Sequence, residues 1–285
     1  MISKKIEDEL FNLKYYSIIN DYEKKSKYMW NLVINQKNKE NKISKKNKIP
    51  KVIIQFWNDS KKIPNDVYEC MKTWKKFQNE KINYLLFDDY SARNFILQNY
   101  DNNHVAAFDK CIHPAMRSDY FRMCYILLEG GAYIDADDVC LLNDIEEIFS
   151  GDILKIQALC YDLINNEMVP AKDAYEKKYT ENDIYYVNNN PLIASPNNKI
   201  VRRALDIATN SLINIKENNI DIQAIAGPGN LINSIVWNTL KNHGMNNDCK
   251  IYINWDQMAI SKWPLDYRND DRNWRNWEKI KCKGR

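Results

Sequence analysis

The chain has 285 residues, which is enough for one large or two modest domains with a substantial core. Its 41 basic and 38 acidic residues leave a net charge of only +3, so the composition excludes a general nucleic-acid footprint, and we expect no nucleic-acid partner. The seven cysteines are scattered and never spaced as C-x-x-C, which is typical of reduced cytosolic thiols. No apolar run is long enough to span a bilayer, and the first residues are too charged for a signal peptide. We therefore expect a cytoplasmic protein.

Apolar residues at helical spacing over residues 2–34 predict one or two amphipathic helices. Residues 37–48 then carry six lysines and one acid among polar residues. This run predicts a solvated linker, or alternatively a basic surface that makes peripheral contact with the inner membrane face. We expect an N-terminal helical extension and basic linker over residues 1–48, followed by the main domain over residues 49–285.

The main domain begins with an alternation of strand and helix. A β-branched run over residues 49–57 predicts a strand buried on both faces. Pro64 begins a helix whose apolar positions repeat as far as Phe77, and residues 82–87 predict a second strand. This spacing predicts a right-handed parallel crossover, the opening of a nucleotide-binding α/β sheet.

Helices are predicted over residues 91–100, 104–110 and 114–129, and the third carries Asp119 and Arg122 on one face. The remaining predicted elements are a helix over 144–149, a strand over 153–160, a mobile loop over 165–183, strands over 184–187 and 192–194, a helix over 199–216, a turn at 227–229, a helix over 231–241 and a strand over 250–254.

The stretch from Gly130 to Val139 is the most informative in the chain. The two glycines end a helix, a short buried strand follows, and Asp135 and Asp137 come directly after it. In extended backbone these carboxylates point the same way, about 7 Å apart at Cα. Two such oxygen donors at the end of a strand suit Mg²⁺ or Mn²⁺ holding a diphosphate. The three histidines of the chain are not clustered, which argues against zinc.

The same stretch has a second enzymatic interpretation. Asp135-Ala136-Asp137-Asp138-Val139 after a strand also fits the D-x-D-x-[T/V] motif of haloacid-dehalogenase phosphatases, with Asp135 as the nucleophile. That reaction needs a later strand that ends in paired acids, and none is evident. A third possibility, a non-catalytic carbohydrate-binding module built on the 18 tyrosines and 8 tryptophans, would not need the D-x-D motif.

Three segments, in this order, resemble glycosyltransferases with a D-x-D motif. They are residues 49–57, the run from Ala115 to Arg122 with its S-D-x-x-R pattern, and the run from Gly130 to Asp137. The nearest group is family 32, which includes yeast mannosyltransferases and bacterial capsule enzymes. The glucosyltransferase domain of the large clostridial toxins is a more distant relative. The resemblance covers residues 49–140 and fades after Gly227-Pro228.

The resemblance implies a GT-A fold, a Rossmann-like nucleotide-sugar-binding α/β fold, here with the N-terminal helical extension. It implies a metal-dependent, retaining hexosyltransferase that uses Mn²⁺ or Mg²⁺ and a UDP- or GDP-linked sugar. The acceptor would be a glycan or a lipid-linked sugar of capsule or lipopolysaccharide synthesis. A toxin-like protein glycosyltransferase, acting on a protein acceptor, is the alternative.

The resemblance also implies roles for individual residues. Asp135 and Asp137 would hold the metal and, with Arg122, would be the catalytic residues. The Ser261-Lys262-Trp263 element has one residue more than the Ser-Trp element of the family and is closer to that of the toxins. The implied donor-binding residues are Gln55, Trp57, Asp119, Arg122, Tyr133, Asp135, Asn190, Ser261 and Trp263.

Overall fold

The computed structural model describes residues 2–37, 49–215, 221–242 and 248–276. Its main sheet has eight strands, and two further strands form a separate ribbon. The strands of the main sheet are β1 (Val52–Phe56), β2 (Asn83–Phe87), β3 (Gly131–Tyr133), β5 (Leu154–Asp162), β6 (Glu167–Val169), β7 (Asp183–Val187), β8 (Leu192–Ala194) and β9 (Cys249–Tyr252). The ribbon pairs β4 (Asp138–Cys140) with β10 (Ala259–Ser261).

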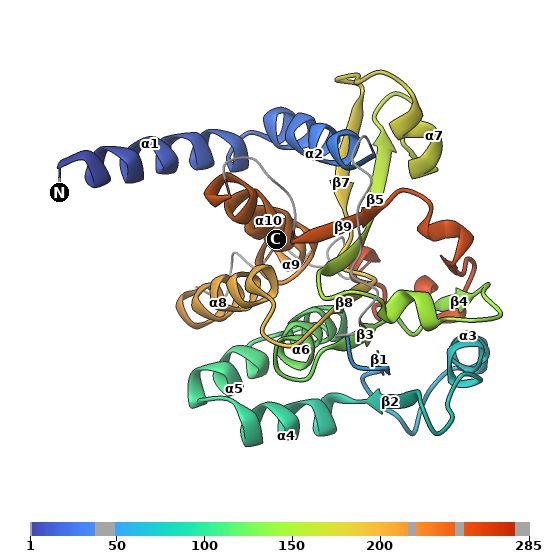
Figure 1. The fold of residues 1–285 in the computed structure, drawn as a ribbon. Coiled ribbons are helices and arrows are strands. Elements are labelled where there is room, and N and C mark those ends of the chain that lie inside the picture. The colour runs from blue at the N-terminus through green and yellow to red at the C-terminus, as the bar shows by residue number, and fades with distance from the viewer. Residues whose placement is uncertain (1, 38–48, 216–220, 243–247, 277–285) are drawn as a thin grey trace.

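The described helices lie on both faces of this sheet and beyond one edge (Figure 1). They are α1 (Ile2–Ile19), α2 (Tyr22–Lys37), α3 (Asn65–Lys75), α4 (Asp89–Asn99), α5 (Asn102–Asp109), α6 (Pro114–Leu128), α7 (Ala171–Glu176), α8 (Lys199–Asn214), α9 (Ile222–Ile225) and α10 (Pro228–Lys241), with the 3₁₀ turns η1 (Glu146–Phe149), η2 (Trp255–Gln257) and η3 (Asp266–Asn269).

The predicted crossover is present at the start of the sheet. Strand β1 pairs in parallel with β2 on one side and with β3 on the other, and α3 connects β1 to β2. Beyond β3 the sheet becomes mixed, because β8 runs antiparallel to both β3 and β5. The order along the main path is β2-β1-β3-β8-β5-β6, and β7 and β9 also pair with β5. The predicted α/β class with N-terminal helices is confirmed.

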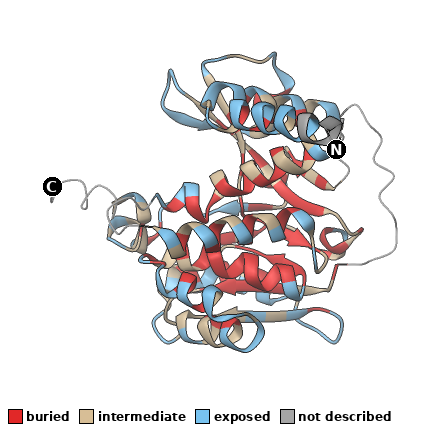
Figure 2. Cartoon of the chain, turned by 90° about the vertical axis from the view of Figure 1, so that its left-hand side faces the viewer, coloured by how far each residue is buried: buried red, intermediate tan, exposed pale blue. Residues whose placement is uncertain are grey.

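Strand β1 is buried on both faces, as its β-branched run predicts. Ile53 and Ile54 are both fully buried, yet they belong to two separate hydrophobic clusters because successive side chains of a strand point to opposite faces. The cluster around Ile54 contains the buried sides of α6, α8 and α10, and the cluster around Ile53 contains Trp74 of α3 and Phe149 of η1. Figure 2 shows these buried residues in the central sheet and in the helices packed on it.

Two glycines turn the chain from α6 into β3. Gly130 and Gly131 have φ values of 71° and 110°, a range that residues with a Cβ atom rarely adopt. A Cβ atom on Gly130 would lie 2.7 Å from Pro196 Cδ and 2.9 Å from the Ala194 carbonyl oxygen. The tight turn therefore brings the polar face of α6 next to the residues that follow β3.

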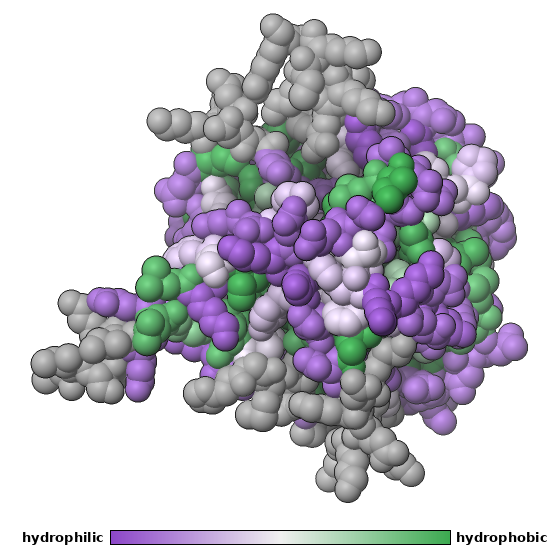
Figure 3. All heavy atoms as spheres, turned by 90° about the horizontal axis from the view of Figure 1, so that it is seen from above, coloured by the Kyte–Doolittle hydropathy of each residue, from purple (hydrophilic) through white to green (hydrophobic). Residues whose placement is uncertain are grey.

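The N-terminal helices pack directly on the sheet and its helices. The Ser26 hydroxyl of α2 accepts a hydrogen bond from the Tyr185 amide of β7 (2.9 Å), and the Gln36 side chain bridges two backbone groups of β9. On α1, the ring of Phe11 meets Trp237 of α10 edge-on at 4.5 Å. The outer face of α1 carries apolar side chains (Figure 3), with Leu13 69% exposed. None of the described helices is both long and apolar enough to cross a bilayer.

One sequence prediction on this architecture was wrong, and another stays a prediction. The predicted mobile loop over residues 165–183 contains β6 and α7, because Tyr175 is buried against Tyr185 at 5.2 Å and fixes the segment to the sheet. Local composition does not reveal this long-range contact. Of the basic run over residues 37–48, all but the first residue lies outside the described residues, so the linker and the boundary at residue 48 stay predictions.

Candidate active site

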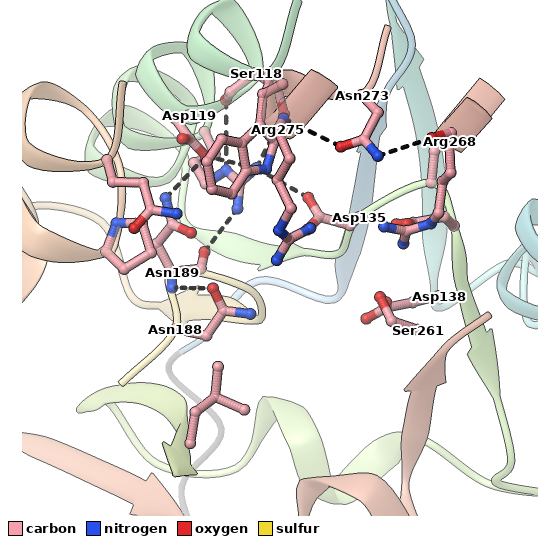
Figure 4. A pocket seen from close by; sticks show the side chains of 18 of the residues that line it. Ser118, Asp119, Asp135, Asp138, Asn188, Asn189, Ser261, Arg268, Asn273 and Arg275 are labelled. Atoms are coloured by element: carbon pink, nitrogen blue, oxygen red, sulfur yellow. Dashed lines mark hydrogen bonds and ion pairs between the residues drawn. The ribbon is translucent and has the colours of Figure 1, made fainter. Parts of the chain in front are cut away.

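A cavity of about 720 Å³ opens beside the carboxyl ends of β1 and β3. Its volume lies within the range of about 300–1,000 Å³ that is usual for small-molecule sites. Its walls come from the D-x-D motif, from the first half of α6, from the antiparallel part of the sheet and from the segment 255–275 (Figure 4). The cavity therefore gathers parts of the chain that lie far apart in the sequence.

The D-x-D motif lies in a turn rather than in extended backbone. Strand β3 ends at Tyr133, and the Asp138 amide donates to the Asp135 carbonyl (3.2 Å), which closes the turn before β4 begins. The Gln55 side chain of β1 donates to the same carbonyl (3.0 Å) and accepts from the Tyr84 hydroxyl (2.7 Å). The prediction of an extended pair was wrong because the turn is imposed by contacts from β1 and β2.

Asp135 is bound by the guanidinium of Arg122 on α6. The two side chains are 2.9 Å apart, and Arg122 also lies 2.9 Å from Asp119 one turn earlier on the helix. The same guanidinium donates to the Ser118 hydroxyl (3.0 Å) and to the Asn189 carbonyl (2.9 Å). Arg122 is only 3% exposed, so this network is part of the protein interior. The single guanidinium serves two carboxylates.

Burial and the shared Arg122 cation act in opposite directions on the pKa values of Asp119 and Asp135. Burial raises the pKa of Asp119 to about 6, opposed by Arg122 and reinforced by the charge of Asp135. Burial also raises the pKa of Asp135, against the attraction of Arg122. For Arg122 itself, burial acts to lower the pKa, but the two carboxylates outweigh it and keep the guanidinium charged.

Asp137 is bound from a different part of the chain. Its carboxylate forms an ion pair with Arg268 of η3 and accepts a hydrogen bond from the Tyr267 hydroxyl (2.7 Å). Its carbonyl accepts from the Lys262 amide (3.0 Å). The Arg268 guanidinium also stacks on the ring of Trp263 at 3.6 Å. The side chains of both Asp137 and Arg268 are about 10% exposed.

Asp138, the residue after the motif, is the most deeply held of the three acids. Its carboxylate accepts from the amide of Asn190 (2.9 Å) and from the hydroxyl of Ser261 (2.8 Å). Asn190 also accepts from the Asp135 amide (3.0 Å), so it fastens both ends of the turn. Burial, followed by repulsion from Asp137 and Asp135, raises the pKa of Asp138 to about 8.

Comparison with known proteins identifies the part of the chain that carries this turn. Residues 64–153 match the model of a family described as "Glycosyltransferase sugar-binding region containing DXD motif". The match supports the glycosyltransferase interpretation over the phosphatase, and it confirms the resemblance found in the sequence.

Two curated relatives resemble the chain over part of its length. An uncharacterized glycosyltransferase of Acanthamoeba polyphaga mimivirus is 30% identical over 100 residues, which cover 33% of this chain and 38% of the relative. Inositol phosphoceramide mannosyltransferase 2 of Schizosaccharomyces pombe is 34% identical over 106 residues, covering 35% of this chain and 28% of the relative. The chain thus spans less than two fifths of each relative that it matches.

A solved structure described as PaToxG glycosyltransferase covers 94% of this chain and 97% of its own chain, with a TM-score of 0.46 and 16% sequence identity.

Most of the residues that the resemblance assigned to the donor lie in the wall of one cavity. Gln55 and Asn190 do not line it and instead hold the backbone of the DXD turn. Tyr133 is buried beneath the Arg122 guanidinium at 4.2 Å. The predicted residues in the cavity wall are Trp57, Asp119, Arg122, Tyr133, Asp135, Asp137, Ser261 and Trp263.

Sequence analysis missed the contribution of the segment after Trp263. Tyr267 and Arg268 contact Asp137 directly, and Arg272 and Arg275 also line the cavity. The dense run of arginine, asparagine and tryptophan in this segment is a signal of composition only and does not indicate a partner. Its partner lies about 130 residues earlier, and no spacing rule connects the two.

The acids of the DXD turn fit a hard divalent cation in part. Their oxygens are the ligands that Mg²⁺ and Mn²⁺ prefer. Among the described residues, however, no group of three or more His, Cys, Asp or Glu side chains is arranged to hold a metal. The positively charged Arg268 guanidinium lies against Asp137, the carboxylate that the sequence analysis assigned to the metal. Arg268 and Tyr267 both contact Oδ2 of Asp137, so a cation at that oxygen would compete with Arg268.

Proposed function

We propose that the chain is a metal-dependent glycosyltransferase of GT-A type that transfers a hexose from a UDP- or GDP-linked donor, with retention of the anomeric configuration. The observation that carries this proposal is the network of Asp119, Arg122 and Asp135, which joins the S-D-x-x-R helix to the DXD turn at one wall of the cavity. The family match at residues 64–153 supports it independently.

The buried network provides a fixed charged wall for the donor. Arg122 has five N–H donors in a rigid plane, and its contacts to Asp119 and Asp135 hold that plane at the cavity wall. Because a fixed charge needs no rearrangement as the reaction proceeds, it stabilises a departing diphosphate more than a mobile one would. Asp119 would accept hydrogen bonds from the sugar, and Trp57, which meets Tyr267 edge-on at 5.3 Å, would stack on the base.

Asp137 and Asp135 would hold the cation. A bound Mn²⁺ or Mg²⁺ would neutralise the negative charge that collects on the leaving diphosphate. The acceptor oxygen would form a bond to the anomeric carbon as the bond from that carbon to the diphosphate oxygen breaks, on the face from which the diphosphate departs, and the hydroxyl proton would leave with the diphosphate. Asn190 and Ser261 support this arrangement by holding Asp138 and thereby the shape of the turn.

The acceptor that we propose is a glycan or a lipid-linked sugar, as in capsule or lipopolysaccharide synthesis, rather than a protein. We infer a cytoplasmic location, with peripheral contact to the inner membrane face through residues 37–48. One curated relative is named for a mannosyl transfer to inositol phosphoceramide, which supports a sugar or lipid acceptor class.

The direct test is release of nucleoside diphosphate from a panel of UDP- and GDP-linked hexoses in the presence of Mn²⁺. We expect one donor to be hydrolysed slowly even without an acceptor, and chelation with EDTA to stop the reaction. A matched pair of variants separates the site from the surface: Asp137→Asn should lose this activity, whereas Asp206→Asn on the outer side of α8 should retain it. Absence of release from every donor would contradict the proposal.

A further inference from the structure

The antiparallel part of the sheet turns an apolar face toward the cavity. In β5 and β7 alternate side chains are buried in the core, such as Cys160 and Tyr185, and the intervening ones line the cavity. The pairing register places Leu159 opposite Tyr186, and Tyr161 opposite both Ile184 and Met168. We name this face the tyrosine platform; it consists of Leu159, Tyr161, Met168, Ile184 and Tyr186.

The composition of the tyrosine platform is unusual for a sheet face that water reaches. Such a face normally carries polar side chains, whereas this one is aromatic and aliphatic and only partly buried, with Met168 49% exposed. Neither Tyr161 nor Tyr186 stacks on another aromatic ring within the described part of the chain, so both rings have surface free for a ligand. An apolar wall with few polar groups beside it is the usual form of a ligand pocket.

Polar groups stand where the platform meets the DXD end of the cavity. The Gln157 amide donates to the Asn190 carbonyl (2.6 Å), and the Asn188 carbonyl oxygen accepts from the Asn189 amide (3.0 Å). In the part of the chain that the structure describes, the side-chain oxygen Oε1 of Gln157 and the side-chain amino group Nδ2 of Asn188 keep no hydrogen-bond partner. Figure 4 shows Asn188 at the edge of the cavity, with the Arg275 guanidinium reaching into the space between Asn188 and Asp135.

We propose that the tyrosine platform is the acceptor subsite and that it binds one hexose ring of a glycoside. This inference rests on the proposed function. A hexose has an apolar C–H face that packs on aromatic rings and an edge of hydroxyl groups that donate and accept hydrogen bonds. The platform supplies the first kind of surface, and Gln157 and Asn188 supply the second.

The polar groups distinguish this occupant from an acyl chain. A lipid chain on the platform would remove Gln157, Asn188 and Arg275 from water without giving them partners, and each buried polar group left unpaired costs free energy. A hexose hydroxyl satisfies these groups instead. Arg275 belongs to the same assembly, because its charge acts on the Tyr186 hydroxyl, whose pKa burial raises to about 12.

The position of the platform fits an acceptor. It shares one continuous cavity with Asp135 and Asp137, where the donor sugar would lie, so a ring on the platform would face the reacting carbon without crossing bulk water. Trp274 and Arg275 line the same cavity, and they come from the segment whose Arg268 binds Asp137. The segment that contains Arg268, Trp274 and Arg275 therefore lines both the donor end and the acceptor end of the cavity.

Saturation-transfer NMR tests binding without requiring catalysis. The probes are methyl α-D-mannopyranoside, methyl β-D-galactopyranoside and octyl β-D-glucopyranoside, each added to the full chain alone and with diamagnetic Mg²⁺ plus UDP or GDP. We expect at least one probe to show transfer to its ring C–H protons. Transfer to the octyl chain but not to any sugar ring would overturn the proposal, as would the absence of transfer from every probe.

Matched variants then assign the signal to the platform. Tyr161→Leu should weaken glycoside binding by about tenfold, the effect of losing an aromatic contact of about 1.4 kcal/mol, and Tyr161→Phe should retain it. Tyr90→Leu serves as the control, because that tyrosine is 78% exposed on α4. Equal binding by wild type and Tyr161→Leu would overturn the proposal.

A kinetic comparison separates this inference from the proposed function. With an active donor, Tyr161→Leu should lower the ratio of glycoside transfer to donor hydrolysis, since water needs no platform. Donor hydrolysis without any glycoside binding would support the proposed glycosyltransferase function and contradict the acceptor subsite. Glycoside binding without turnover of any donor would contradict the proposed function and leave a sugar-binding platform.

Discussion

The two carboxylates of the DXD motif lie two residues apart, yet parts of the chain that are far apart in the sequence bind them. Asp135 is bound by Arg122, a 3%-exposed residue of the central helix α6 and within the family-matched region. Asp137 is bound by Arg268, which lies in a short 3₁₀ turn near the end of the described chain and outside that region. One carboxylate thus belongs to the rigid core and the other to an attached segment.

This difference suits the two carboxylates to two tasks: the Asp135 side positions the donor, and the Asp137 side exchanges its cationic partner. A charge fixed in the core can position a donor without rearrangement, because its partners are locked by packing. The Arg268 side chain otherwise stacks on Trp263 and Tyr267 of its own segment, so releasing it from Asp137 would leave the contacts of Arg122 in place and would let that carboxylate exchange its partner. We expect substitutions on the Asp135 side to affect both folding and activity, and those on the Asp137 side to affect activity and ligand exchange.

The largest effect is expected at Arg122. Arg122→Ala leaves Asp119 and Asp135 buried without their shared cation, which should lower the free energy of unfolding by about 3–5 kcal/mol. Donor hydrolysis should fall at least about 100-fold. Urea denaturation and diphosphate release measure the two effects.

The control for Arg122 lies on the same helix. Arg117 pairs with Asp89 and donates to the Cys111 carbonyl (3.0 Å), but its side chain is 22% exposed against 4% for Arg122, so Arg117→Ala should cost less than Arg122→Ala. Arg122→Lys keeps the charge and should fold, while still losing the planar contacts that orient Asp135. If Arg122→Ala were as stable as wild type, the core assignment of this half of the motif would be wrong.

The second effect concerns Asp137 and should be almost purely functional. In Asp137→Asn the side-chain oxygen can still accept from Tyr267 and Arg268, so the unfolding midpoint should change less than in Arg122→Ala. Donor hydrolysis should fall at least about 100-fold, because a neutral amide is a poor ligand for Mn²⁺. Diphosphate release near the wild-type rate would show that Asp137 holds no catalytic metal.

The third effect tests exchange at Asp137 directly. Arg268→Gln removes the cation that competes with a metal for this carboxylate, so Mn²⁺ affinity should rise by about tenfold or more. Titration of free Mn²⁺ by electron paramagnetic resonance measures this without turnover. Arg272→Gln is the matched control, since Arg272 pairs with Asp270 in the same segment. Weaker Mn²⁺ binding by Arg268→Gln would mean that Arg268 assists the metal rather than excluding it.

The same division explains what the sequence predicts and what it does not. The parallel crossover, the polar face of α6 and the glycine turn into β3 follow from local periodicity and backbone chemistry, and all are present. Asp119, Arg122 and Asp135 lie within 17 residues of one another and meet through two regular elements, so their proximity is predictable from α6 and β3. For these elements local and tertiary preferences agree.

Contacts between residues far apart in the sequence cannot be predicted from local periodicity or motif spacing. The contact of Arg268 with Asp137 depends on how the segment after β10 returns across the cavity, and no repeat or motif spacing specifies that path. The tyrosine platform depends on the register between β5 and β7, which the turn and the buried contacts of Tyr185 determine. Asn190 was assigned to the donor, and the structure shows its side chain bound to the DXD turn.

The smallest effect is a pH dependence confined to the core half. Burial raises the pKa of Asp119 to about 6, above the value of about 3.9 for an unfolded aspartate. Between these values the folded chain keeps a proton that the unfolded chain has lost, so stability falls as the pH rises from about 4 to 6, by at most about 1.4 kcal/mol per pH unit. Asp119→Asn removes this proton and should flatten that part of the profile.

Urea midpoints at pH 4, 5, 6 and 7 for wild type and Asp119→Asn give the difference between the two profiles. The difference should change between pH 4 and 6 and stay constant above that range, because both folded and unfolded Asp119 are then ionised. A difference that is constant throughout would show that Arg122 satisfies both carboxylates at once. Asp119 would then ionise in the folded chain as it does in the unfolded chain, with the Arg122 guanidinium between it and Asp135.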